Sequence, residues 1–221
     1  MFVINTIVSK VVKAEKKKLF SAFIGFEKAY DRINRNLLLL KLQRLCISGL
    51  FYRNIKSMYK SVSYLVKVAK GHLDPIGSSL GLKQGGVLSP LLFNVFIDDM
   101  KDIFDETCDP VMELGKPLPH LLYADDLVLM PASQSGLNNC IAKLETFCDK
   151  WQLDVNIKKS KIVIFNPSGR NMAKPKFAYK GTQLETVQSY CYLGIDLSSS
   201  GFFVRSRLNL KGNGAQMLIF Y

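Results

Sequence analysis

The sequence predicts a mixed α+β fold in which short strands alternate with amphipathic helices. Apolar residues recur with a period near 3.6 in residues 2–18 and 135–151, and with a period of two in residues 62–68. The chain has 221 residues, 48% of them hydrophobic, and shows no internal repeat. A chain of this size and composition can bury a sizeable core as one domain with subdomains.

The first third of the chain predicts a helix, a strand, two further helices and a second strand. Residues 2–18 form the first helix, whose C-terminal lysines complement the helix dipole and are typical of a solvated helix end, with a phosphate clamp as the alternative. The strand at 19–26 is followed by helices near 36–45 and 50–60. Residues 62–68 alternate in polarity, which predicts a half-buried strand.

The rest of the chain predicts a loop, a helix, a hairpin, another helix and three strands. Pro90 lies in the first turn of its helix, and the face shared by Leu137, Ile141, Leu144 and Cys148 is apolar. The predicted elements are a loop at 75–81, a helical segment at 90–104, a hairpin at 121–129, a helix at 135–151, a strand at 161–165 that ends at 166–169, and short strands through Tyr179 and Tyr192.

Two adjacent acids, Asp125 and Asp126, stand between two short apolar runs, which predicts a β-hairpin with both carboxylates at its turn. Like charges side by side repel, so a cation is expected there. Oxygen ligands favour Mg²⁺, which keeps several waters and takes one or two protein carboxylates plus substrate phosphates. The alternative interpretation is a solvated acidic turn.

A two-metal phosphoryl-transfer site needs a further carboxylate that bridges both ions. The upstream strand at 19–26 is followed by Lys28, Ala29, Tyr30 and Asp31. Here the chain resembles the reverse transcriptase of LINE-type (non-LTR) retrotransposons, an RNA-directed DNA polymerase. In that family the strand carries an Asp, two residues, then Lys-Ala, an aromatic residue and a second Asp. This chain has Gly25 where the family's catalytic Asp stands.

Three further blocks resemble the family and stand in its order. They are residues 81–94 for the template and nucleotide, residues 151–161 downstream of the Asp pair, and residues 190–195 for the primer-grip hairpin. The resemblance implies a polymerase palm with an antiparallel sheet, packed helices and partial fingers in residues 1–200. Residues 201–221 are expected to be a truncated start of a thumb or an unrelated tail, and the chain a truncated copy without an endonuclease domain.

The resemblance also implies the metal ligands. Asp125 is expected to bind Mg²⁺, with Mn²⁺ as a possible substitute, and Asp126 to bind or support the same ion. Phe26 is expected to lend its backbone carbonyl to the metal. Such ions lower the pKa of the primer 3′-hydroxyl and neutralise charge on the triphosphate.

Nucleotide and primer contacts follow from the same resemblance. Tyr30 is expected to exclude a ribose 2′-hydroxyl, Gln84 and Gly85 to contact the nucleotide and its template base, and Lys159 to offer a proton or positive charge to pyrophosphate. The primer end is expected on Tyr192, Leu193 and Gly194. Each assignment has a plain alternative: a core Tyr, a common glycine loop, a solvated Lys and an edge-hairpin turn, respectively.

Gly25 determines the prediction for activity. A bridging carboxylate contributes several kcal/mol of electrostatic organisation, so its loss should cost on the order of a thousand-fold in rate. Asp31 lies too far along the chain to replace it, and Glu27 is displaced by ~7 Å along the strand. Three hypotheses stand: a reverse transcriptase with catalysis lost or impaired, a non-catalytic nucleic-acid-binding module, and an active polymerase that uses Glu27 or Mn²⁺.

The composition agrees with a nucleic-acid partner. Thirty Lys and Arg against 18 acids give a net charge of +12, which attracts a polyanion. The expected partners are an RNA template, a DNA primer and deoxynucleoside triphosphates. No apolar run approaches the ~20 residues of a membrane span, and no signal peptide is visible. Two histidines and five cysteines without Cys-x-x-Cys spacing disfavour a zinc site and disulfides, so an intracellular protein, nuclear or cytoplasmic, is expected.

Overall fold

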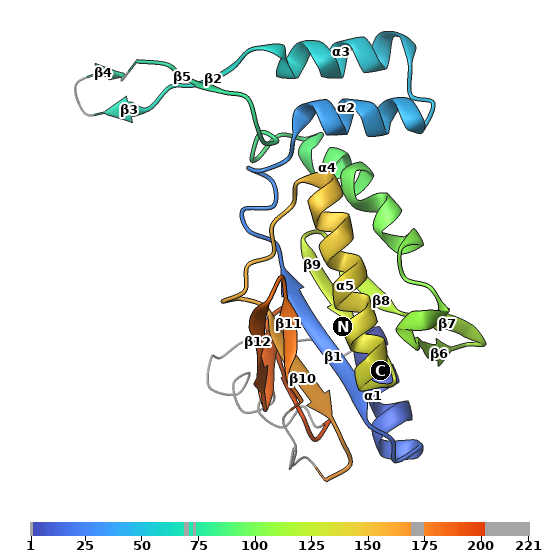
Figure 1. Cartoon of the computed structure of the whole chain (residues 1–221). Helices are drawn as coiled ribbons and strands as arrows, with labels where there is room; N and C mark the ends of the chain where they lie inside the picture. The colour runs from blue at the N-terminus through green and yellow to red at the C-terminus, as the bar shows by residue number, and fades with distance from the viewer. Residues whose placement is uncertain (1, 69–70, 73, 169–174, 202–221) are drawn as a thin grey trace. The chain divides into compact units, whose positions relative to one another are not determined.

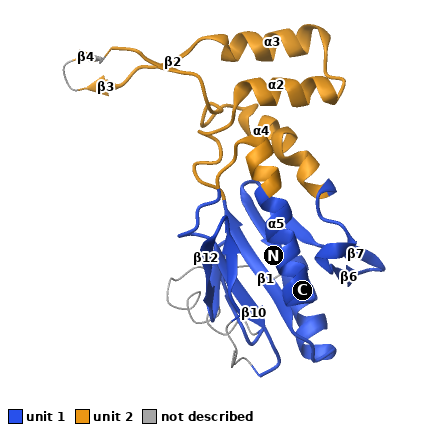
Figure 2. Ribbon diagram, in the orientation of Figure 1, with its two compact units in different colours: residues 1–25, 102–145, 155–221 blue, residues 26–101, 146–154 orange. Residues whose placement is uncertain are grey.

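A six-stranded sheet is the framework of the first of two compact units in the computed structural model (Figures 1 and 2). The model describes residues 2–68, 71–72, 74–168 and 175–201. Unit 1 comprises residues 1–25, 102–145 and 155–221, and unit 2 comprises residues 26–101 and 146–154. The predicted thumb or tail lies outside the described residues, apart from its first residue, Gly201.

The sheet of unit 1 has the strand order β11-β12-β10-β1-β9-β8. Its strands are β1 (Leu19–Gly25), β8 (His120–Tyr123), β9 (Asp126–Leu129), β10 (Lys161–Phe165), β11 (Phe177–Tyr179) and β12 (Thr182–Val187). All neighbouring strands are antiparallel except β10 and β12, which are parallel. The α+β class is therefore confirmed, with a mixed sheet in place of a wholly antiparallel one.

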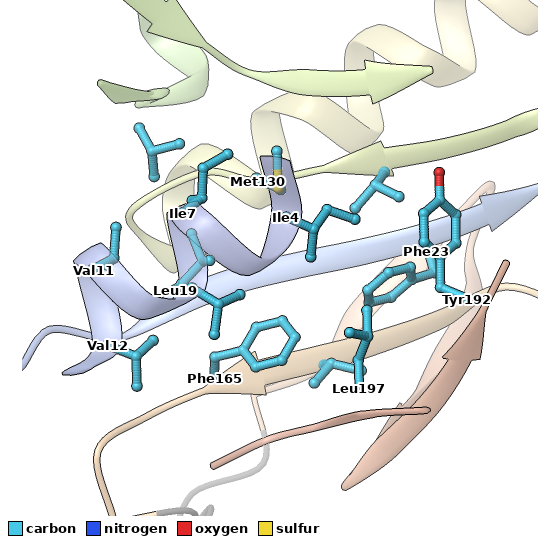
Figure 3. Close-up of a cluster of buried hydrophobic side chains, with 14 residues drawn as sticks. Ile4, Ile7, Val11, Val12, Leu19, Phe23, Met130, Phe165, Tyr192 and Leu197 are labelled. Atoms are coloured by element: carbon cyan, nitrogen blue, oxygen red, sulfur yellow. The ribbon is translucent and has the colours of Figure 1, made fainter. Parts of the chain in front are cut away.

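The N-terminal helix packs against this sheet and forms its core. Helix α1 (Phe2–Val8) continues as a π-helix (Ser9–Ala14) and ends there, four residues before the predicted end. Lys16 adopts a left-handed conformation (φ 56°), which breaks the helix and turns the chain into β1. Figure 3 shows the buried side chains of this core, among them Ile4, Ile7, Val11, Val12, Leu19, Phe23, Met130, Phe165, Tyr192 and Leu197.

Smaller elements of unit 1 surround the sheet. A hairpin of β6 (Val111–Glu113) and β7 (Lys116–Leu118), which the sequence did not predict, follows a 3₁₀-helix at Glu106–Cys108. A second hairpin pairs β13 (Ser189–Tyr192) with β14 (Ile195–Ser198). Helix α5 (Gln134–Trp151) contributes its first part to unit 1 and its last residues to unit 2.

Unit 2 is built on helices. They are α2 (Arg35–Arg44), α3 (Gly49–Lys60), α4 (Ser89–Ile97), a 3₁₀-helix (Asp98–Asp102) at its edge, and the end of α5. Asn34 caps α2, because its side-chain oxygen accepts hydrogen bonds from the N–H groups of Asn36 and Leu37. In the described part of the chain, no helix combines the length and apolar character that crossing a membrane requires.

An arm of two short ribbons extends from α3 (Figure 1). β2 (Val62–Tyr64) pairs with β5 (Ile76–Ser78), and β3 (Lys67–Val68) pairs with β4 (Gly71–His72). The predicted half-buried strand at 62–68 is wrong, because this stretch forms two short strands whose side chains are exposed apart from the half-buried Val62, with Tyr64 45% exposed. The predicted loop at 75–81 likewise contains a strand. These strands pair through their backbones while most of their side chains stay exposed, so alternation does not report burial there.

A lysine lies in the core of unit 2. The Lys41 side chain is 5% exposed, and its ammonium lies 3.7 Å from the centre of the Trp151 ring and 4.8 Å from that of Phe96. It donates hydrogen bonds to the carbonyl of Phe96 and to the carboxylate of Asp99. This ion pair and the aromatic rings compensate part of the cost of burying its charge.

Candidate functional site

The hairpin of β8 and β9 presents Asp125 and Asp126. Tyr123 and Asp126 face each other across the hairpin, so Ala124 and Asp125 form a two-residue turn. Ala124 adopts a left-handed conformation (φ 51°), as at the first central position of a II′ turn. This conformation costs a non-glycine residue about 1 kcal/mol. Such strain is typical of functional turns. The predicted hairpin is confirmed, with Asp125 in its turn and Asp126 as the first residue of β9.

Gly25 lies directly opposite Asp126 in the register of β1 and β9. Its N–H donates to the Ser160 hydroxyl (3.2 Å), and its carbonyl accepts from the N–H of Asn156 (2.8 Å). Among the described residues, a Cβ at position 25 would meet one atom within 4 Å, the Cβ of Lys159 at 3.6 Å, an ordinary contact. The packing therefore leaves room for a Cβ at position 25.

Residues facing one another across strands place their side chains on the same face, so a carboxylate at position 25 would be a neighbour of Asp126. Burial raises the pKa of Asp126, the charge of Asp125 raises it further, and the ammonium of Lys159 opposes both effects. The Lys159 backbone is held by two bonds: its N–H donates to Asn156 Oδ1 (3.0 Å), and its carbonyl accepts from the Tyr190 hydroxyl (3.3 Å). A cation added at this acid pair would relieve the mutual repulsion.

The donor set suits one Mg²⁺ ion, because two carboxylates are hard oxygen ligands. In the described ranges, no group of three or more His, Cys, Asp or Glu side chains is arranged to hold a metal. A third carboxylate at position 25 is what a two-ion arrangement would need. The residues present therefore fit a single ion and do not supply the bridging ligand of a pair.

The hairpin of β13 and β14 lies beside the acid pair and is anchored in the core. Tyr192 is 5% exposed, and its ring lies 5.4 Å from that of Phe23. Burial, together with Asp126, raises the pKa of Tyr192 to about 12. Leu193 and Gly194 both have positive φ (48° and 78°), the geometry of a type I′ turn, and both are exposed. The part of the predicted primer grip that is exposed is thus its tip.

In unit 2, Tyr30 is half-buried, and its ring stacks on that of Phe93 with centroids 4.6 Å apart. The Tyr30 carbonyl accepts a hydrogen bond from the N–H of Leu82 (2.8 Å). Gly81 adopts φ +84°, and a Cβ there would lie 2.6 Å from the carbonyl oxygen of Asp31, so only glycine fits. The segments at 30–33 and 81–84 are thereby tied together.

Gln84 is held by Asp31, a residue of the motif that follows β1. Its side-chain amide donates to Asp31 Oδ1 (2.7 Å), a contact between residues 53 positions apart. The exposed Gly85 follows in a left-handed turn (φ 74°). The order of the motifs marked both residues as parts of family blocks. No signal in the sequence indicated that Asp31 orients Gln84.

The predicted site residues thus fall into two groups. Unit 1 brings Gly25, Asp126, Lys159 and Tyr192 together, with Asp125 next to Asp126 in the turn. Unit 2 holds Tyr30, Gln84, Gly85 and the buried Phe26. Ser160, Asn156 and Tyr190, which hold the backbone around Gly25 and Lys159, were not predicted as site residues.

Comparisons with known proteins agree with one another. The family model described as reverse transcriptase (RNA-dependent DNA polymerase) matches residues 3–197. The RNA-directed DNA polymerase from the mobile element jockey of Drosophila melanogaster is 29% identical over 219 residues, covering 94% of this chain and 23% of the relative. The retrovirus-related Pol polyprotein from the type-1 retrotransposable element R2 of Nasonia vitripennis is 26% identical, covering 95% and 21%. The chain therefore spans less than a quarter of these relatives' length.

Solved structures share the fold. Apo telomerase from Candida tropicalis superposes with a TM-score of 0.62 at 15% identity, covering 90% of this chain and 34% of that chain. Telomerase from Candida albicans in complex with a fragment of telomeric RNA gives a TM-score of 0.59 at 15% identity, covering 90% and 32%. At this identity the likeness shows the α+β fold alone.

Proposed function

The chain belongs to the reverse transcriptase (RNA-dependent DNA polymerase) family, and we propose that it supplies the palm and part of the fingers of a retrotransposon polymerase. Such a polymerase extends a DNA primer with deoxynucleotides on an RNA template. We also propose that this chain is catalytically defective, because position 25 has no carboxylate. The observation that carries the proposal is the register that sets Gly25 opposite Asp126.

We assign the metal to the acid pair. Asp125 would bind Mg²⁺ or Mn²⁺, Asp126 would bind or support the same ion, and the carbonyl of Phe26 would complete the protein ligands. When bound, the ion lowers the pKa of the primer 3′-hydroxyl and neutralises charge on the triphosphate. Lys159 would add positive charge beside the acid pair, since its ammonium lowers the pKa of Asp126.

The remaining roles concern binding. Tyr30, fixed by its stacking on Phe93, would exclude a ribose 2′-hydroxyl. Gln84, oriented by Asp31, would contact the nucleotide and template base, with the exposed turn at Gly85 allowing close backbone approach. Lys159 would stabilise the leaving pyrophosphate.

The primer would lie on the hairpin tip. Leu193 and Gly194 are the exposed residues of that turn, and Tyr192 anchors the tip in the core. An anchored turn presents its backbone groups at a fixed position, which suits holding a primer end in line with a reacting group.

The defect follows from electrostatics. A bridging carboxylate lowers the free energy of the transition state by several kcal/mol, because it holds both metal ions in place. Its absence should therefore lower the rate on the order of a thousand-fold. Asp31 is not expected to substitute for it, because it stands six residues beyond position 25 in the chain.

The test is primer extension on an RNA template in Mg²⁺ and in Mn²⁺, with the native chain and Gly25→Asp side by side. Extension by Gly25→Asp alone supports both the site and the defect. Extension by the native chain at a similar rate would refute the defect and make Glu27 the next residue to change. Failure of both, with retained RNA binding, would favour a non-catalytic nucleic-acid-binding module.

A further inference from the structure

The positive charge of the chain is concentrated in one stretch of unit 2. Residues 32–97 contain ten Lys or Arg side chains and one acid, Asp74, and so carry nine of the twelve net positive charges of the chain. This stretch comprises α2, α3, the arm and α4. A field of one sign over connected elements attracts anions and is strongest where the surface is concave.

A cavity of about 620 Å³ lies within this basic stretch, between α2, α3 and the foot of the β2–β5 ribbon. Its lining residues are basic, hydroxylic, amide, aromatic and aliphatic, without any acid. The polar groups most relevant to a ligand are Arg35, Asn36, Lys56, Tyr59, Lys60 and Ser79. The cavity is therefore a concave, donor-rich surface of positive potential.

Arg35 builds the wall of the cavity. Its side chain is buried, and its guanidinium donates hydrogen bonds to the carbonyls of Gly81, Ser78 and Leu80. These partners are neutral, so its charge is held in place without being cancelled by a carboxylate. A fixed cation of this kind contributes to the potential inside the cavity at no further ordering cost.

Two exposed lysines complete the basic surface. Lys56 and Lys60 lie one helical turn apart on α3, with their Cβ atoms about 5–6 Å apart, while Ile55 on another face of the helix is buried. No ion pair described for this part of the chain involves either lysine. Tyr59 comes directly before Lys60 on the same helix, and the guanidinium of Arg35 lies 5.3 Å from the centre of the Tyr59 ring.

We propose that this cavity binds the sugar–phosphate backbone of a single-stranded nucleic acid, as a contact separate from the residues assigned to the metal and nucleotide. Lys56 and Lys60 would neutralise neighbouring phosphates, and Tyr59 would stack against a base, the combination that single-strand-binding surfaces use. The choice of a nucleic acid over an acidic protein segment rests on the proposed function and on the aromatic ring beside the cations.

The test measures binding by the full chain to labelled oligouridine RNA and oligothymidine DNA in EDTA, as a function of salt. The variant is Lys56→Ala with Lys60→Ala. The matched control is Lys101→Ala with Lys150→Ala, which removes two exposed cations of the same unit outside the cavity. Circular dichroism and thermal unfolding check that both variants fold.

For the cavity variant, the slope of log K against log salt should be smaller in magnitude by about 1.4. Each lost phosphate contact with a single strand removes ~0.7 from that slope, and the variant loses two. Tyr59→Leu should weaken binding at unchanged slope, and Tyr59→Phe should bind as the native chain does. Equal slopes for the cavity variant and the control would overturn the proposal. A cavity variant that keeps its RNA affinity but loses affinity for a labelled polyglutamate peptide would overturn it too.

Both RNA and DNA arms report on the same backbone chemistry, and a preference for one identifies the strand. Because the measurement contains EDTA, it does not depend on the acid pair. A failure of Gly25→Asp to extend a primer would therefore count against the proposed catalysis and leave this result unaffected.

Discussion

Gly25→Asp should make the stability of the protein depend on Mg²⁺. The new carboxylate would face Asp126 across β1 and β9, with the Cβ atoms about 4.5–5.5 Å apart. Two unit charges ~5 Å apart repel by about 3 kcal/mol at an effective dielectric constant of ~20. Replacing a strand glycine recovers about 0.5–1 kcal/mol of backbone entropy. Without metal, the variant should therefore be less stable than the native chain by roughly 2 kcal/mol.

Bound Mg²⁺ should reverse this deficit. An ion present at about a hundred times its Kd stabilises the folded state by ~2.7 kcal/mol, which offsets the repulsion. The native chain, with two carboxylates, should bind the ion more weakly and gain less. The assay is the unfolding midpoint in urea in EDTA and in Mg²⁺ at matched ionic strength.

Gly25→Asn is the control, because it adds a side chain of similar volume without charge. It should show neither the loss of stability in EDTA nor the added response to Mg²⁺. Equal Mg²⁺ responses for native, Asn and Asp chains would refute the reasoning, since position 25 would then not face the metal ligands. An Asp variant as stable as the Asn variant in EDTA would refute the predicted repulsion.

Three further predictions concern unit 2. Gly81→Ala should destabilise the protein by about 1–3 kcal/mol, since φ is +84° and the Cβ would lie 2.6 Å from the Asp31 carbonyl oxygen. Gly77→Ala, with open space around it, should change the free energy of unfolding by less than ~0.5 kcal/mol. Urea unfolding compares the two variants. Burial lowers the pKa of Lys41 from 10.5 to about 8. Between these two pH values the unfolded state binds more protons than the folded state, so the free energy of unfolding should rise with pH, by up to about 3 kcal/mol. The rise should be absent in Lys41→Met, and a parallel pH profile of stability for both chains would contradict it. In the Gly25→Asp background, Asp31→Ala should raise the KM for deoxynucleotides as Gln84→Ala does, because Asp31 holds the Gln84 amide. The double variant should have a KM no higher than that of either single variant. Additive effects in steady-state kinetics would show that Asp31 does not act through Gln84.

Much of the fold could be predicted because its elements bury one face. Helix α5 and strand β10 were placed within one residue of their observed ends, since the apolar residues of α5 repeat at the helical period and β10 is a short continuous apolar run that ends at turn residues. The resemblance to LINE-type reverse transcriptases is confirmed by the family match and the mobile-element relatives. Motif order carries such a resemblance even where individual residues differ.

The failures have physical causes. The alternating residues of the arm pair with another ribbon strand and stay exposed, so their pattern carried no information about burial. The short β6–β7 hairpin has three-residue strands, too short for a period to appear. The contact between Asp31 and Gln84 depends on tertiary structure across 53 residues, which no local pattern encodes.

The backbone of Gly25 is fastened by groups that do not depend on its side chain. Its N–H donates to the Ser160 hydroxyl and its carbonyl accepts from the N–H of Asn156, while the space beside it has room for a Cβ. The backbone at this position is therefore held in the same way for either residue, and what an aspartate would change is the local charge. When bound Mg²⁺ offsets the repulsion expected of an aspartate there, the two forms should unfold about equally often, so quality control that acts on unfolded chains would not separate them.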